Sequence, residues 1–101
     1  MSSLEPKSAP QEMKEVTTKV RVANRMGLHT RPATSIVKLL QGCRSDVQFT
    51  YRKQTVNAKS ILSILLLAAP RNSKITIRVR GTDAEETLNK LIEAFENQFG
   101  E

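Results

Sequence analysis

The sequence has 101 residues, a length that predicts one domain able to bury a modest hydrophobic core. Its formal net charge of +6 is unevenly spread: residues 83–101 carry −5, residues 1–14 balance, and the middle of the chain therefore carries +11. One cysteine (Cys43) and one histidine (His29) exclude an internal disulfide and leave little to build a transition-metal site, and no apolar run is long enough to span a bilayer.

The N-terminal residues 1–14 are rich in Ser, Pro, Glu and Lys and carry little apolar material. This composition predicts a disordered N-terminal tail, with the folded domain spanning residues 15–101. Residues 1–10 lack the apolar segment of a signal peptide, and the only cysteine has no partner. We therefore expect a cytoplasmic protein without membrane insertion.

The predicted domain begins with a strand and a helix. Residues 16–23 alternate apolar and polar side chains, which predicts a half-buried strand. A helix is predicted from Thr30 to about Gln41, because apolar residues recur along one face at helical spacing: Ala33, Ile36, Val37 and Leu40. Gly42, just beyond, is a typical C-terminal stop for such a helix.

The middle of the chain predicts a hairpin and a short helix. Residues 46–51 and 54–57 both alternate, and the two polar residues between them form the predicted turn. Ser60 is then the predicted N-cap of an apolar helix over residues 61–67.

A strand and a helix complete the chain. Residues 74–80 alternate and predict a fourth strand, and Thr82 with Glu85 has the spacing of a capping box that opens the last helix. The resulting order, βαββαβα, predicts an α+β open-faced two-layer sandwich. Its four-stranded antiparallel sheet would carry three helices on one face.

The stretch from Met26 to Ala33 places the only histidine at the start of the first predicted helix. Pro32 is tolerated in a first helical turn, where its missing N–H has no partner, so His29 lies at or beside the N-cap. Helix N-termini offer unpaired N–H donors and partial positive charge, which disfavour an imidazolium and attract anions. A neutral imidazole beside Arg31 is suited to accept a phosphoryl group, whereas a plain exposed or capping histidine is the structural alternative.

Residues 27–33, with the sequence Gly-Leu-His-Thr-Arg-Pro-Ala, resemble the active-site signature of HPr, the histidine-containing phosphocarrier family of the bacterial sugar phosphotransferase system. Residues 56–63, Val-Asn-Ala-Lys-Ser-Ile-Leu-Ser, resemble the second signature of that family. The resemblance runs from about Val16 to Phe99, and two signatures at the family's spacing are far more specific than either alone. HPr-like proteins adopt the open-faced sandwich predicted above.

The resemblance implies a phosphoryl carrier that catalyses no reaction by itself. Whether such a protein counts as an enzyme is left open. Phosphorylated enzyme I would pass a phosphoryl group to Nδ1 of His29, and the carrier would pass it on to a histidine of enzyme IIA domains. Arg31 would neutralise the transferring oxygens, and the backbone N–H groups of Thr30, Arg31 and Ala33 would hold them. No cofactor or metal is implied, and we expect a monomer.

The second signature carries a candidate regulatory site and a candidate partner surface. In part of the family, the serine that matches Ser60 is phosphorylated by a dedicated kinase (HPr kinase/phosphorylase), although Ser60 has a role as N-cap in any case. The helix after it is unusually apolar, so Leu62 and Leu65 are expected to be exposed, with complete burial as the alternative. Together with Lys38 and Lys59 they would meet acidic partners.

Two other functions remain open. A regulatory or nitrogen-type phosphotransferase carrier, not coupled to sugar uptake, would use the same histidine. The basic middle of the chain is also compatible with a nucleic-acid-binding domain. Against this, the four aromatic residues lie mostly in core-facing patterns and offer no stacking platform, so we expect no nucleic acid among the partners.

Overall fold

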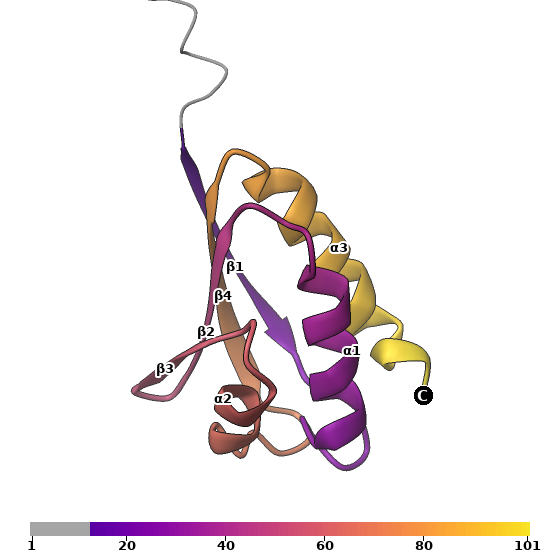
Figure 1. Ribbon diagram of the computed structural model, residues 1–101. Helices are drawn as coiled ribbons and strands as arrows, with labels where there is room; N and C mark the ends of the chain where they lie inside the picture. Colours follow the sequence, from indigo (N-terminus) through magenta and orange to yellow (C-terminus); the bar gives the residue numbers. More distant parts are fainter. Residues whose placement is uncertain (1–12) are drawn as a thin grey trace, which may run out of the picture.

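A computed structural model describes residues 13–101 and has the predicted βαββαβα order (Figure 1). Residues 1–12, most of the predicted tail, lie outside the described residues, and Lys14 already belongs to the first strand, one residue before the predicted domain start. The elements are β1 (Lys14–Arg21), α1 (Thr30–Leu40), β2 (Asp46–Tyr51), β3 (Gln54–Asn57), α2 (Ile61–Leu66), β4 (Lys74–Gly81), α3 (Ala84–Glu96) and a final 3₁₀ turn, η2 (Gln98–Gly100).

The sheet has the strand order β1-β4-β2-β3, and every neighbouring pair is antiparallel. Val79 of β4 shows the register, because it pairs with Val16 of β1 on one side and with Val47 of β2 on the other. All three α-helices cover the same face of the sheet (Figure 1). The predicted open-faced sandwich is therefore confirmed.

The hydrophobic core lies between the sheet and the helices. Alternation on β4 sends every second side chain into it, as the strand pattern predicted. Phe49 of β2 meets Phe95 of α3 edge to face, with ring centroids 5.9 Å apart. The largest fully buried apolar side chains come from both layers: Val22, Ile36, Leu40, Val47, Phe49, Ile64, Ile75, Ile77, Val79 and Leu91.

The N-termini of α2 and α3 are fixed in different ways. Ser60 caps α2 as predicted, since its hydroxyl accepts a hydrogen bond from the Ser63 N–H at 3.2 Å. The predicted capping box of Thr82 and Glu85 was wrong, because Asp83 occupies the N-cap position of α3 and makes no side-chain cap there. The Asp83 carboxylate instead accepts hydrogen bonds from a neighbouring loop, which the sequence pattern could not reveal.

Within residues 13–101, no helix is both long enough and apolar enough to cross a membrane. The short helix α2 carries exposed apolar side chains, and it lies near the site described next.

Candidate functional site

The loop between β1 and α1 is held against the segment that joins α2 to β4. Gly27 has a φ of +74°, and a Cβ atom there would lie 2.4 Å from the Ala69 carbonyl oxygen. That carbonyl accepts a hydrogen bond from the Leu28 N–H at 3.0 Å. Only glycine permits both this backbone conformation and this close approach, so Gly27 fixes the path by which the chain reaches His29.

His29 occupies the N-cap position of α1, as predicted, with extended backbone dihedrals. Its ring makes no capping hydrogen bond to the described helix, and its side chain is 32% exposed. Beside it lies a shallow hollow of about 350 Å³, whose lining includes Leu28, Leu65 and Pro70. The ring is therefore positioned by its backbone and remains accessible from solvent on one side.

The first turn of α1 supplies fewer free donors than expected. Pro32 has no N–H, and the Ala33 N–H donates to the His29 carbonyl oxygen at 3.0 Å as the first bond of the helix. The amides of Thr30 and Arg31 have no acceptor within the helix. Of the three predicted phosphate-binding amides, Ala33 is thus already engaged, and Thr30 and Arg31 are left to meet an anion.

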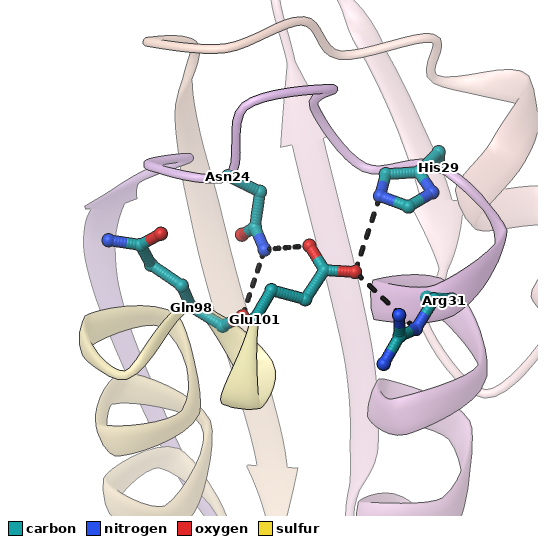
Figure 2. Close-up of polar contacts among 5 residues, drawn as sticks. All are labelled: Asn24, His29, Arg31, Gln98 and Glu101. Atoms are coloured by element: carbon teal, nitrogen blue, oxygen red, sulfur yellow. Dashed lines mark hydrogen bonds and ion pairs between the residues drawn. The ribbon is translucent and has the colours of Figure 1, made fainter.

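Figure 2 shows a carboxylate between His29 and Arg31. Oε2 of Glu101 lies 3.4 Å from Nε2 of His29 and 3.8 Å from Nε of Arg31. The Arg31 side chain is 79% exposed, so it reaches the carboxylate from the solvent side. Because Glu101 faces Nε2, the Nδ1 atom is the ring nitrogen turned away from this carboxylate.

The carboxylate is held in turn by Asn24, which is 1% exposed. Its Nδ2 donates to Oε1 of Glu101 at 2.7 Å and to the backbone oxygen of Gln98 at 2.9 Å. Sequence reasoning singled out neither Asn24 nor Glu101, since no motif contains them and 77 residues separate them along the chain. Within residues 13–101, no group of three His, Cys, Asp or Glu side chains is placed to bind a metal ion.

Comparison with known proteins decides the family. A family model described as the PTS HPr component phosphorylation site matches residues 16–97, which include both predicted signatures. The chain belongs to the HPr family. HPr is the phosphocarrier of the phosphotransferase system, so the predicted family is confirmed.

Relatives and solved HPr structures agree with this assignment. The chain is 44% identical over 92 residues to the phosphocarrier protein HPr of Chlamydia muridarum, covering 91% of this chain and 88% of the relative. A crystal structure of HPr-C-His from Thermoanaerobacter tengcongensis superposes with a TM-score of 0.79 and 34% identity, covering 87% of this chain and 97% of that one. A crystal structure of an HPr dimer from the same organism gives a TM-score of 0.69 and 32% identity, covering 81% and 94%.

Exposed apolar side chains occur on α2, which begins within the second HPr signature, and on the loop that leads to the histidine. Leu62 and Leu66 are 67% and 60% exposed, and Met26 from the histidine loop is exposed as well. Leu65, which was expected to be exposed, is half-buried because it packs against the core, and it lines the hollow next to His29. We define the apolar patch as Met26, Leu62 and Leu66.

The two predicted lysines of the partner surface differ in their surroundings. Lys38 is exposed in the last turn of α1. Lys59 is half-buried, and its Nζ donates to the Cys43 carbonyl oxygen at 3.3 Å. Ser60 is also half-buried, and its hydroxyl is already in use as the cap of α2. Lys38 is therefore the freer of the two cations.

Proposed function

We propose that the chain carries a phosphoryl group on His29, which it receives from phosphorylated enzyme I and donates to a histidine of enzyme IIA domains. The observation that carries the proposal is the placement of His29 in a chain of the HPr family. The ring stands at the N-cap of α1 without a capping bond, partly exposed and next to Arg31. A nucleophile needs this combination of accessibility and a nearby anion site.

The ring geometry favours Nδ1 as the acceptor atom. A carboxylate that faces Nε2 stabilises the proton on that nitrogen, which leaves the lone pair on Nδ1. The nitrogen–phosphorus bond to the donor histidine breaks while the bond to Nδ1 of His29 forms. The reverse exchange at enzyme IIA returns His29 to its starting state.

The groups around the ring stabilise the charge on the moving phosphoryl oxygens. Arg31 supplies a flexible cation, and the amides of Thr30 and Arg31 supply donors at the positive end of the α1 dipole. Pro32 is buried and restricts the backbone of this turn, so these donors are oriented before the phosphoryl group arrives. Phosphoryl transfer depends mainly on such positioning and charge stabilisation.

Partner docking is proposed at the apolar patch, with Lys38 as an exposed cation farther along α1. The patch comes from α2 and the histidine loop, so a partner that covers it also covers the ring. Coupling to sugar uptake, regulatory phosphorylation of Ser60 by an HPr kinase, and a monomeric state remain predictions.

The direct test is incubation with enzyme I and phosphoenolpyruvate, followed by intact-mass measurement. The wild-type chain should gain the mass of one acid-labile phosphoryl group. His29→Ala should gain none, while its circular dichroism spectrum stays unchanged because the side chain caps nothing. Absence of an adduct on the folded wild-type chain would refute the proposed function.

A further inference from the structure

Within residues 13–101, Met26 is the most exposed of the large apolar side chains, at 74%. It stands in the loop between β1 and α1, three residues before His29, and it lines the same hollow as the imidazole ring and Leu65. It also belongs to the apolar patch, together with Leu62 and Leu66. Its thioether is therefore open to solvent in the free protein and would be covered when a partner docks.

Methionine differs from the two leucines of the patch in its chemistry. A lone pair of the sulfur attacks one oxygen of hydrogen peroxide, the oxygen–oxygen bond breaks, and water leaves once the protons have transferred. The sulfur is oxidised by two electrons and the peroxide is reduced. The product, methionine sulfoxide, carries a polar oxygen where the side chain was apolar, and sulfoxide reductases reverse the change.

We propose that Met26 is a peroxide-sensitive modification site, and that its oxidation to the sulfoxide weakens partner docking at the apolar patch. The inference rests on the proposed function and adds a reversible control of the docking step to it. In the free protein, the sulfoxide oxygen is hydrated. An apolar partner surface that covers the patch removes this water without replacing its hydrogen bonds, which costs binding free energy.

Two other sulfur-containing side chains of the described residues serve as comparisons. Met13 is 55% exposed but precedes β1, at the end of that strand remote from His29, so its oxidation leaves the patch unchanged. Cys43 is half-buried, and its Sγ lies 3.6 Å from the Ser45 carbonyl oxygen. Peroxide oxidises thiols as well, but methionine sulfoxide reductase acts only on the methionines. Enzymatic reversal therefore separates the two kinds of residue.

The test is treatment with hydrogen peroxide, peptide mass mapping of the oxidised residues, and calorimetric titration with enzyme I before and after treatment. Wild type with Met26 oxidised should bind enzyme I about tenfold more weakly than the untreated chain, and methionine sulfoxide reductase should restore the affinity. In Met26→Leu, the affinities before and after treatment should be equal, because leucine is not oxidised. The matched variant Met13→Leu should lose affinity on treatment as wild type does.

Three results would overturn the proposal. One is an unchanged affinity of the wild-type chain with Met26 fully oxidised. Another is an equal loss of affinity in treated Met26→Leu, which would assign the effect to a different side chain such as Cys43. The third is a Met26 that stays reduced while Met13 is oxidised, which would remove Met26 as a modification site.

Phosphorylation by enzyme I and phosphoenolpyruvate, run on untreated and oxidised chains, separates this inference from the proposed function. An untreated chain that gains no phosphoryl group would refute the proposed function. If the untreated chain is phosphorylated and the oxidised chain reacts and binds equally well, only the control by Met26 is refuted.

Discussion

The chemistry of His29 is set by neighbours that come from opposite ends of the chain. Arg31 follows it on α1, while Glu101 reaches it from the segment after α3. The two groups have opposite effects on an incoming phosphate, since the guanidinium attracts it and the carboxylate repels it.

Arg31→Ala should slow phosphoryl transfer from enzyme I about a hundredfold, because a cation aimed at the transferring oxygens is lost. The fold should persist, as the Arg31 side chain is 79% exposed. Rapid-quench measurement of phosphohistidine formation checks the rate. The control is Arg80→Ala, which removes an exposed arginine of β4. Arg80 lies opposite Glu15 in the register of β1 and β4, at the end of β1 that is remote from His29, so this variant should transfer at the wild-type rate. An unchanged rate in Arg31→Ala would contradict its role.

His29 and Arg31 could be predicted from sequence because they lie in one contiguous signature whose helix start is marked by Pro32. The pair of Asn24 and Glu101 could not, because it exists only after β1, α1 and α3 have packed together. Ala33 is a different case, because the sequence could have excluded it as a free donor. Once His29 is the N-cap, the Ala33 amide is the one that makes the first helical bond, to the His29 carbonyl oxygen.

At the level of elements, Asp83 ties the start of α3 to the loop before β2. Its carboxylate accepts hydrogen bonds from the Arg44 N–H at 2.9 Å and from the hydroxyl of fully buried Ser45. The Arg44 backbone donor, followed by the Ser45 hydroxyl, lowers the pKa of Asp83 from its usual value of 3.8. Gly81 packs so closely here that a Cβ would lie 2.4 Å from the Ser45 Oγ atom.

Asp83→Ala should lower the free energy of unfolding by about 1–3 kcal/mol at neutral pH, because the buried Ser45 hydroxyl loses its acceptor. A lowered carboxyl pKa stabilises the fold above the unfolded value of 3.8, and that contribution is lost as pH falls through the folded pKa. The difference between wild type and variant should therefore shrink below about pH 4. Urea unfolding at several pH values measures it.

Glu93→Ala, at an exposed position of α3, is the control for this substitution and should change stability by no more than about 0.5 kcal/mol. A gap between wild type and Asp83→Ala that widens below pH 4 would contradict the assignment.

The strands were predictable from their alternation, and Ser60 from its place before an apolar run. The start of α3 was not, because two polar residues in a row compete for the cap and a partner distant in sequence decides between them.

On the scale of the whole molecule, the site and the apolar patch lie at one end of the sandwich. The start of α1 and the short helix α2 lie beside each other there, at the opposite end from the α3 start (Figure 1). The sheet face away from the helices carries exposed cations of β1 and β4: Lys19, Arg21, Lys74, Arg78 and Arg80. The charge of the basic middle is thus spread over the back of the molecule as well as around the histidine.

Leu62→Ser should weaken binding to enzyme I about tenfold, because the side chain is 67% exposed and belongs to the proposed docking surface. Its free energy of unfolding should stay unchanged, since the side chain is not in the core. Calorimetric titration and urea unfolding measure the two quantities. Met13→Ser removes an exposed apolar side chain next to β1 and should bind like wild type. Equal binding by both variants would exclude α2 as the docking surface.

The central claim is that Nδ1 of His29 carries the phosphoryl group, because Glu101 faces the other ring nitrogen. The most direct measurement is NMR of the ¹⁵N-labelled chain after phosphorylation by enzyme I and phosphoenolpyruvate, with the phosphorus located through its coupling to the ring nitrogens. We expect a single phosphohistidine at His29, bonded through Nδ1. Phosphorus on Nε2, or on any other residue, would contradict it.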